Sequence, residues 1–381
     1  MSQIYKTRNF NVLTKEETME SIFTLKNFPV HMGCVDFDKN NDKFVDLTFD
    51  ICKKTGIIQV RQLIDFDYLY ITPHNDAIGK TWENLFKTIV NLSKKYVKGK
   101  KKFIEIGGGS GKLAIEFLNN LPEIEKYTIY EPNILTKLNN PKINLIREYF
   151  DYKVNIEDND VYIHSHVIEH VENPNDFIGS ISKNCKIGDY LIFAAPNLKE
   201  TLTRKYTNCL NFEHIFFIID DYIDIILINN GFEICEKSYY KEDHSIIYVT
   251  RFTNVLSNIL YPNLYDKNKI LIQNFISYHK DMVNNFNKVI KNFNGNVYLF
   301  GGHIFSLYLI KFGLNIDKIK CIIDNSPSKN KKRLYGTNLF VEYPNIIDKN
   351  EKCIVILKAA GYQEEIREQL LNINKNIIIL E

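Results

Sequence analysis

The sequence predicts a mixed α/β fold built around a parallel sheet, and two observations lead to this prediction. From residue 100 onward, short apolar runs alternate with stretches of helical periodicity, a pattern typical of parallel strands joined by crossover helices. The composition is that of a globular protein, because 45% of the residues are hydrophobic and 25% are charged. A chain of 381 residues has room for roughly two to three domains.

Net charge and cysteine content indicate which binding partners and which cellular compartment to expect. Lysine and arginine total 48 against 46 aspartate and glutamate, a net charge of +2, which argues against a protein that grips nucleic acid. The seven cysteines are scattered and form no CxxC pair, as in a reduced chain. Aspartates interrupt the most apolar stretch, 215–228, so we expect no membrane span. A cytoplasmic protein with a small-molecule substrate is therefore expected, with neither a membrane nor a nucleic-acid partner.

The first 80 residues are expected to form a small mixed domain. Short β-like runs at 44–49 and 56–60 alternate with polar turns. Helical periodicity begins near Trp82, where apolar residues recur on one face. The second predicted domain therefore begins at residue 81.

Residues 81–260 show the clearest alternation of strand and helix. Buried strands are predicted at 103–106, 127–130, 161–164 and 190–195. Two further runs, 232–240 and 244–251, flank a tight polar turn and predict an antiparallel hairpin. The sheet is thus expected to be parallel, with this hairpin at its C-terminal end.

A second α/β unit is expected after a connecting helix. Helical spacing runs through 266–294, inside a connecting segment assigned to 261–295. Residues 296–381 repeat the strand and helix pattern and predict a Rossmann-like unit, with strands at 297–300, 320–323, 353–357 and 377–380 and a helix at 304–312. This unit lacks GxGxxG, so a separate NAD site is not expected.

A glycine-rich turn follows the first strand of the central domain. Gly107, Gly109 and Gly111 let the backbone turn tightly and approach a ligand without interference from a Cβ atom. The following helix offers N–H groups and the positive end of its dipole. The spacing is GxGxG, which is neither the dinucleotide fingerprint nor a P-loop, since leucine follows Lys112. Glu131 ends the next strand about 25 residues on, where an acidic residue holds ribose hydroxyls in such folds.

Residues 103–111, Phe-Ile-Glu-Ile-Gly-Gly-Gly-Ser-Gly, resemble motif I of class I S-adenosylmethionine-dependent methyltransferases. The resemblance implies a class I, Rossmann-like methyltransferase sheet and S-adenosylmethionine as the cofactor, with S-adenosylhomocysteine as its product. It assigns cofactor binding to five residues, Glu105, Gly107, Gly109, Gly111 and Glu131.

The end of the predicted strand 161–164 extends this resemblance. The run from His164 to Val171, His-Ser-His-Val-Ile-Glu-His-Val, is similar to one that follows the fourth core strand in many of these enzymes. His164, Ser165 and His166 are therefore expected to border the cofactor. Glu169 and His170 are interpreted as residues that cap and anchor the following helix.

A second feature is the segment Asn211-Phe212-Glu213-His214. A Glu–His pair can perform acid–base chemistry, because histidine titrates near neutrality and a carboxylate orients or tunes it. The residues alone leave a second interpretation open, in which Glu213 caps the next helix and His214 packs.

The whole chain resembles the three-domain sugar methyltransferases that include nucleotide-sugar C-methyltransferases. That family carries a Tyr-x-Glu-His motif implicated in proton transfer, which implies catalytic roles for Glu213 and His214, with Asn211 in place of the tyrosine. Its C-terminal pattern is matched by 297–303 and 321–329. Four residues there are assigned to the substrate, Gly302, His303, Asp324 and Lys329, although a role in shaping the cleft or in dimer contact is an open alternative.

The family's N-terminal zinc domain has two CxxC pairs, and here only Cys34 and Cys52 remain, with His31 nearby. Two thiolates and one imidazole do not complete a tetrahedral site, so zinc is not expected and no metal-binding residue is assigned. The domain is expected to serve as a substrate-facing lid.

The expected reaction is O-methylation of a nucleotide-linked sugar for a surface polysaccharide or glycoconjugate, with Glu213 and His214 as the base pair. C-methylation of a keto-sugar needs an enolate stabiliser as well as a base, and the loss of tyrosine at Asn211 disfavours it without removing it. An NAD-linked sugar oxidoreductase and a non-catalytic binding protein are more remote alternatives. A homodimer is left open.

Overall fold

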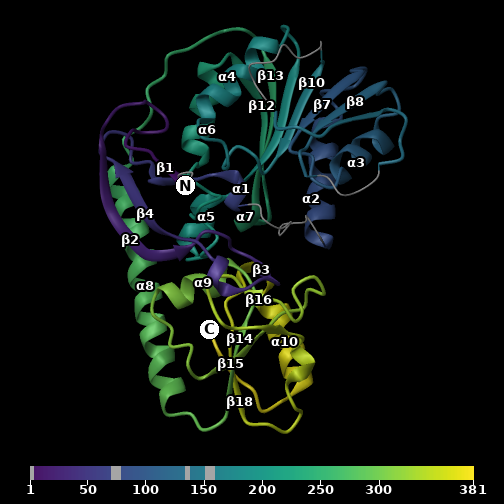
Figure 1. Cartoon of the computed structure of the whole chain (residues 1–381). Coiled ribbons are helices and arrows are strands. Elements are labelled where there is room, and N and C mark those ends of the chain that lie inside the picture. The colour runs from purple at the N-terminus through teal and green to yellow at the C-terminus, as the bar shows by residue number, and fades with distance from the viewer. Residues whose placement is uncertain (1–3, 70–78, 134–137, 151–158) are drawn as a thin grey trace.

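The computed structural model describes residues 4–69, 79–133, 138–150 and 159–381. Figure 1 shows two α/β lobes, with the N-terminal strands and a long helix running along one side. Within these described ranges, no helix has the length and apolar character needed to cross a membrane.

The upper lobe is built on a seven-stranded sheet in the order β12-β13-β11-β10-β7-β8-β9. All neighbours pair in parallel except β13, which is antiparallel to β11 and β12. The strands are β7 (Lys102–Ile106), β8 (Lys126–Tyr130), β9 (Ile143–Ile146), β10 (Val161–Ser165), β11 (Tyr190–Pro196), β12 (Phe232–Tyr240) and β13 (Ser245–Phe252). The predicted α/β fold with an antiparallel hairpin is confirmed.

Helices cover both faces of this sheet. The apolar side chains of α2 (Lys80–Ser93) and α3 (Lys112–Asn120) share one buried cluster with one face of the strands. Those of α4 (Pro174–Asn184) and α6 (Asp220–Asn229) share a second cluster with the opposite face. Short helices α5 (Leu198–Thr203) and α7 (Lys241–His244) lie at strand ends. The sheet is therefore buried on both sides, as its parallel pairing requires.

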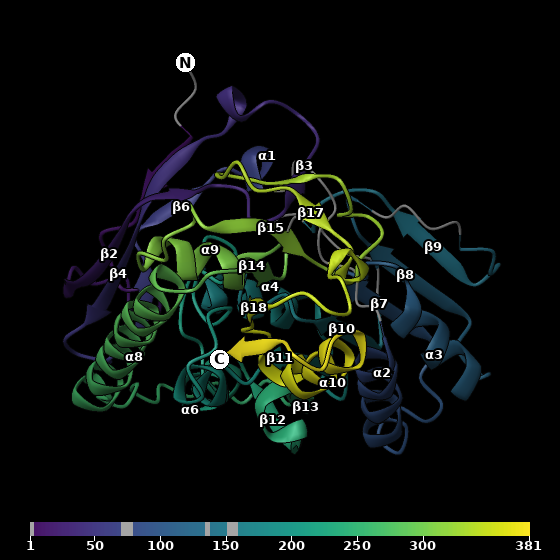
Figure 2. The same ribbon diagram turned by 90° about the horizontal axis from the view of Figure 1, so that it is seen from below.

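The lower lobe contains a parallel five-stranded sheet, ordered β17-β15-β14-β18-β19. Its strands are β14 (Asn296–Phe300), β15 (Ile319–Ile323), β17 (Val341–Glu342), β18 (Cys353–Ile356) and β19 (Ile378–Leu380). It carries α9 (Ile304–Lys311), α10 (Gln363–Ile373) and the 3-10 turns η2 (Pro344–Ile346) and η3 (Ala360–Tyr362). The predicted connecting helix is α8 (Tyr265–Lys291), seen at the side of this sheet in Figure 2.

The N-terminal segment folds as short sheets, β2-β4-β5 and β1-β6, with one further strand reaching the lower lobe. Its elements are β1 (Tyr5–Thr7), β2 (Met19–Pro29), β3 (Cys34–Val35), η1 (Lys39–Asn41), β4 (Phe44–Cys52), β5 (Ile58–Val60), β6 (Gln62–Ile64) and α1 (Phe66–Leu69). β3 pairs with β16 (Arg333–Leu334) of the lower lobe. The N-terminal segment also bonds to the upper lobe through β5. There the Val60 N–H group donates to the Ile215 carbonyl, and the Phe217 N–H group donates to the Ile58 carbonyl.

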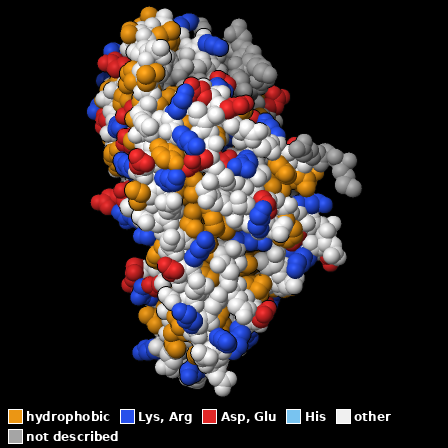
Figure 3. Space-filling view, turned by 90° about the vertical axis from the view of Figure 1, so that its left-hand side faces the viewer, with side chains coloured by type: hydrophobic (Ala, Val, Ile, Leu, Met, Phe, Trp, Pro, Cys, Tyr) orange, Lys and Arg blue, Asp and Glu red, His pale blue; other side chains and the backbone are white. Residues whose placement is uncertain are grey.

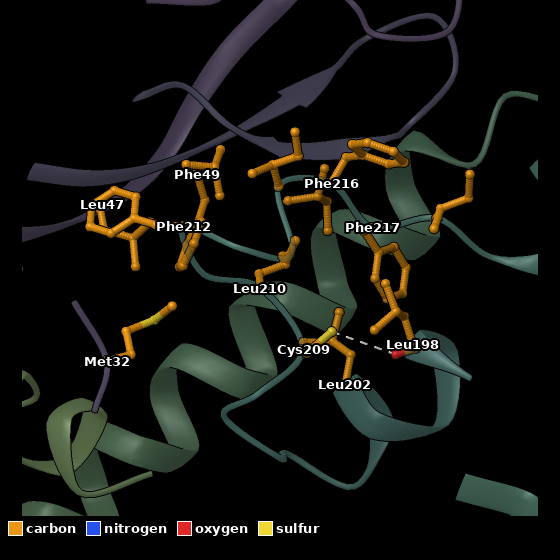
Figure 4. Close-up of a cluster of buried hydrophobic side chains, with 14 of the residues drawn as sticks. Met32, Leu47, Phe49, Leu198, Leu202, Cys209, Leu210, Phe212, Phe216 and Phe217 are labelled. Carbon is orange, nitrogen blue, oxygen red and sulfur yellow. Dashed lines mark hydrogen bonds between the residues drawn. The ribbon is translucent and has the colours of Figure 1, made fainter. Parts of the chain in front are cut away.

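A continuous apolar core joins these parts. One buried cluster contains residues of the N-terminal sheet, of both lobes and of α8. Figure 4 shows Leu47 and Phe49 of β4 near Leu210 and Phe212 of the upper lobe. The N-terminal segment is thus packed between the lobes, and the division into domains at 80, 260 and 295 stays a prediction. Figure 3 shows acidic and basic side chains interspersed over one face, as the near-zero net charge predicts.

Candidate active site

The glycine turn joins β7 to α3. The Gly107 N–H group donates to the Tyr130 carbonyl at 2.8 Å, which ties the turn to the end of β8. Gly107, Gly109 and Gly111 have φ values of +69°, +52° and +74°, a region that disfavours residues with a Cβ atom. A Cβ atom placed on Gly109 would have no atom of the described residues within 4 Å. The turn is therefore open on its outer side.

Glu131 holds the turn from the end of the next strand. Its carboxylate accepts the N–H groups of Gly109 at 3.0 Å and of Asn133 at 2.9 Å, and the residue is partly exposed. Each carboxylate oxygen has a second lone pair, so Glu131 keeps the capacity to accept the hydroxyl groups of a ribose. Its place agrees with the expected cofactor role, which stays a prediction.

Glu105 does not face a ligand, which corrects its assignment as a direct cofactor contact. The residue is 2% exposed, and its carboxyl accepts a hydrogen bond from the Tyr127 hydroxyl at 2.9 Å. Burial raises the pKa of Glu105 to about 8, so it holds a proton at neutral pH. A Cβ atom on Gly108 would lie 3.4 Å from the Glu105 carboxyl carbon, so Glu105 supports the turn from below.

Five of the nine histidines gather where β10 ends. Burial first, and then the nearby imidazoles of His244, His214, His170 and His164, hold the pKa of His166 well below its ordinary value. The next residue, Val167, packs on the glycine turn, since a Cβ atom placed on Gly107 would lie 2.7 Å from Val167 Cγ2. The histidine cluster and the glycine turn are therefore in direct contact.

Ser165 and His166 lie at the edge of this cluster. Both are partly exposed, and the Ser165 hydroxyl lies 3.1 Å from His166 Nδ1. His166 Nε2 lies 3.0 Å from the Ser245 hydroxyl, which also lies 2.7 Å from His244 Nδ1. His166 has a φ of +56°, a strained value for a non-glycine residue. Such strain is typical of functional sites, and both residues stay candidates to border the cofactor.

His164 is placed differently from the prediction. Its side chain has no exposed surface and stacks on Phe193 with ring centroids 4.5 Å apart. Burial lowers the pKa of His164 to about 3, so the ring is neutral. It packs beneath the site and offers no surface to a cofactor, because it alternates along β10 with residues of the other face.

The segment from Asn211 to His214 reaches the same cluster. The Asn211 side-chain oxygen accepts the N–H groups of Glu213 at 2.7 Å and of His214 at 3.0 Å, and its amide group donates to Asn208 at 3.5 Å. Asn211 therefore shapes the loop, and its assignment as a catalytic residue is corrected to a positioning role. Burial outweighs the adjacent Glu213 carboxylate and lowers the pKa of His214.

Glu169 and His170, interpreted from sequence as helix anchors, lie against His214. The imidazole rings of His170 and His214 have centroids 5.0 Å apart, and His170 Nε2 lies 3.8 Å from a Glu169 carboxylate oxygen. The sequence held a signal for this, because a Glu–His pair occurs at both 169–170 and 213–214. Only the fold shows that the two pairs meet.

Comparison with known proteins identifies this region. Residues 80–237 match the family model described as "Methyltransferase domain". The match covers less than half of the chain, and this part of the chain is similar to a methyltransferase domain. A comparison with curated protein sequences finds no match.

Comparison with solved structures finds partial matches to methyltransferases. They include human N-acetylserotonin methyltransferase in complex with S-adenosylmethionine (17% identity, 45% of this chain and 55% of that chain, TM-score 0.37). Another is the mitomycin 7-O-methyltransferase MmcR, with 15% identity over 44% of this chain and 54% of that chain and a TM-score of 0.36. A third is the N,N-8-amino-8-demethyl-D-riboflavin dimethyltransferase of Streptomyces davawensis, with 16% identity over 45% of this chain and 55% of that chain and a TM-score of 0.36. The chain spans about half the length of these three proteins.

The four residues assigned to the substrate in the lower lobe are used internally. Asp324 accepts hydrogen bonds from the Gly302 N–H group at 2.8 Å and from Lys329 Nζ at 3.0 Å. His303 caps α9 by accepting the Phe305 N–H group, and burial lowers the pKa of His303 to about 3. These contacts agree with the alternative in which the four residues shape this lobe, and their assignment to the substrate stays a prediction.

The residues considered for an N-terminal zinc site have separate partners. The Cys34 thiol donates to the Gly302 carbonyl at 3.2 Å, whereas Cys52 Sγ accepts the Asn11 amide at 2.9 Å. His31 Nδ1 lies 3.0 Å from the Leu69 carbonyl. Each therefore contributes to packing of the N-terminal segment.

Proposed function

We propose that this protein transfers the methyl group of S-adenosylmethionine to a hydroxyl group of a nucleotide-linked sugar. The observation that supports this proposal is the contact between the glycine turn and the histidine cluster, through Val167 and Gly107. A methyl donor held at the turn would lie beside several partly exposed imidazoles, of which His214 is the proposed base. The sugar class rests on the sequence resemblance to three-domain sugar methyltransferases, with lid, methyltransferase and Rossmann-like domains.

The tautomer of His214 suits it to act as a base. Its Nδ1 atom lies 2.8 Å from the Asn208 carbonyl, which can only accept, so Nδ1 carries the proton and Nε2 keeps its lone pair. Nε2 would accept the proton of the acceptor hydroxyl while its oxygen attacks the methyl carbon. The S–CH3 bond then breaks, the O–CH3 bond forms, and neutral S-adenosylhomocysteine leaves.

The loop geometry favours oxygen over carbon as the methylated atom. C-methylation requires stabilisation of an enolate in addition to a base. Asn211 stands at the position of the family's tyrosine, and its amide is engaged by loop backbone groups at 2.7 to 3.5 Å. O-methylation needs only a positioned hydroxyl group and the base.

Two measurements test this proposal. Calorimetry should detect S-adenosylhomocysteine binding, and mass spectrometry should detect a gain of one methyl group on a member of a panel of nucleotide sugars. His214→Gln should retain the binding and lose at least 100-fold in kcat. The control is His279→Gln on α8, a buried histidine outside the cluster. Full activity of His214→Gln, or the lack of a methylated sugar, contradicts the proposal.

A further inference from the structure

Glu169, His170 and His214 form a compact group of ligand atoms. One atom from each, a carboxylate oxygen or an imidazole nitrogen, lies within 4.8 Å of the other two. Among the residues that the structure describes, this is the only group of three or more His, Cys, Asp or Glu side chains so arranged. Glu169 and His170 come from the turn after β10, and His214 comes from the segment that precedes α6.

The backbone fixes the tautomers of both histidines. His170 Nδ1 lies 3.0 Å from the Glu213 carbonyl, and His214 Nδ1 lies 2.8 Å from the Asn208 carbonyl. Because a carbonyl oxygen only accepts, each Nδ1 carries a hydrogen and each Nε2 presents a lone pair. An imidazole whose Nδ1–H is held by a backbone carbonyl is the usual form of a metal-ligating histidine.

The carboxylate supplies an independent observation. Glu169 is 0% exposed, and among the residues that the structure describes neither of its carboxylate oxygens has a hydrogen-bond partner. Burial of such a group without a partner is costly, and here burial raises the pKa of Glu169 to about 8. A cation at this position would neutralise the carboxylate and use both the buried oxygens and the oriented Nε2 atoms.

The distances need only a small adjustment to hold an ion. Bonds of about 2.1 Å to nitrogen and oxygen in a tetrahedral site place the ligand atoms about 3.4 Å apart. The Glu169 oxygen and His170 Nε2 are already 3.8 Å apart. The other separations do not exceed 4.8 Å, which is about 1.4 Å beyond this tetrahedral spacing.

We propose that Glu169, His170 and His214 bind one divalent transition-metal ion of the zinc class. Two imidazoles and one carboxylate suit such ions, whereas Mg²⁺ and Ca²⁺ prefer oxygen ligands. Three protein ligands leave a position for an oxygen atom of the methyl acceptor. The role of the ion in methyl transfer rests on the proposed function, but its binding does not.

This site changes the role assigned to His214. Nε2 cannot ligate a metal and accept a proton at the same time. A bound ion would make an acceptor hydroxyl at the open position more acidic, and His214 would then hold the ion; the role of His214 as the base applies to the metal-free protein.

The binding test uses the full chain without a polyhistidine tag, stripped of metal and then titrated with Zn²⁺ or Co²⁺. We expect one ion per chain by elemental analysis, visible absorption bands from bound Co²⁺, and no displacement by millimolar Mg²⁺. Glu169→Gln, which preserves shape, should weaken Co²⁺ binding at least tenfold, and His170→Gln should do the same. The absence of stoichiometric Co²⁺ binding by the wild-type protein overturns the proposal.

The matched control is His279→Gln. His279 is buried, and its Nδ1 lies 2.8 Å from the Phe275 carbonyl, but within the described part of the chain it belongs to no such group of ligands. It should bind Co²⁺ like the wild type. Equal Co²⁺ affinity in Glu169→Gln and wild type would also overturn the proposal. Calorimetry with S-adenosylhomocysteine on every variant reports the cofactor site separately, so failure of metal binding is distinguishable from failure of the proposed function.

Discussion

Two turns of similar design lie at the ends of central strands in the two parallel sheets. In the upper lobe β7 leads through Gly107 to α3, and in the lower lobe β14 leads through Gly301 to α9. In both turns the first glycine N–H group donates at 2.8 Å to a carbonyl at the end of the neighbouring strand. An acidic residue beyond that strand, Glu131 or Asp324, then accepts a second glycine N–H group.

The two turns differ in what covers them. Gly109 in the upper turn is exposed, and a Cβ atom placed on it would meet no atom of the described residues within 4 Å. A Cβ atom placed on Gly302 in the lower turn would lie 2.8 Å from Cys34 Sγ. Lys329 also neutralises Asp324 at 3.0 Å. The comparison teaches that a strand–glycine–acid pattern specifies a turn, and that access decides whether the turn is available to a ligand.

The N-terminal segment that carries Cys34 is the cover of the lower turn. The largest effect should come from the ion pair between Asp42 of this cover and Arg333 of the lower lobe. Arg333 is 5% exposed and donates to both carboxylate oxygens of Asp42, at 2.7 and 2.8 Å. Arg333→Ala leaves a buried carboxylate uncompensated and should lower the free energy of unfolding by about 3 to 5 kcal/mol in urea titrations. Lys6→Ala breaks an exposed pair with Glu172 and should cost under about 1 kcal/mol. Equal losses would mean that the buried pair does not hold the cover in place.

Substitution of the two acidic residues, Glu131 and Asp324, should affect cofactor binding only in the upper turn. Glu131→Ala removes the acceptor of the Gly109 N–H group and the expected ribose contact, so the Kd of S-adenosylhomocysteine should rise about 100-fold. Asp324→Ala should change this Kd by less than about twofold, although it lowers stability by leaving Lys329 unpaired. Calorimetry measures both Kd values. A large Kd change in Asp324→Ala would mean that the lower turn also contributes to cofactor binding.

The support beneath the upper turn should be sensitive to pH. The folded-state pKa of Glu105 is about 8, above the value of 4.5 for an unperturbed carboxyl, so the folded state retains a proton that the unfolded state releases. Wild-type stability should therefore fall through this group as the pH rises from about 5 to 8. Glu105→Gln removes this loss and keeps an acceptor for Tyr127. Its free energy of unfolding relative to wild type should rise by about 3 kcal/mol between pH 5.5 and 8. Parallel pH profiles of the two proteins would contradict this account.

The sequence predicted the elements whose patterns are local. Strands β7, β8, β10 and β11, the β12–β13 hairpin and α8 are found within a few residues of their expected bounds. β2 was not predicted, because its residues Met19–Pro29 mix polar and apolar side chains without alternation. β9 is a short edge strand with no fully buried residue, so it too leaves a weak pattern.

The site was predicted less completely, because contacts between distant residues are not written in local patterns. His164 and Ser165 are adjacent in sequence, yet one is buried beneath the site and the other reaches its edge. The sequence likewise gives no sign that Gly302 is covered, since Cys34, which covers it, lies 268 positions away. The meeting of Glu169 with His214 likewise depends on how two loops pack.

The smallest effect tests the cover itself. Gly302 has an ordinary φ, so Gly302→Ala should be destabilised through contacts of its new Cβ atom with Cys34 Sγ at 2.8 Å and Val341 Cγ2 at 3.0 Å, by about 1 kcal/mol. Cys34→Ala removes the nearer of these two contacts and should restore part of this loss in a double-mutant cycle. Gly109→Ala should also lose about 1 kcal/mol, but through its left-handed φ of +52°, so Cys34→Ala should not rescue it. Rescue of both variants, or of neither, would mean that direct contact with Cys34 is not what distinguishes the covered turn from the open one.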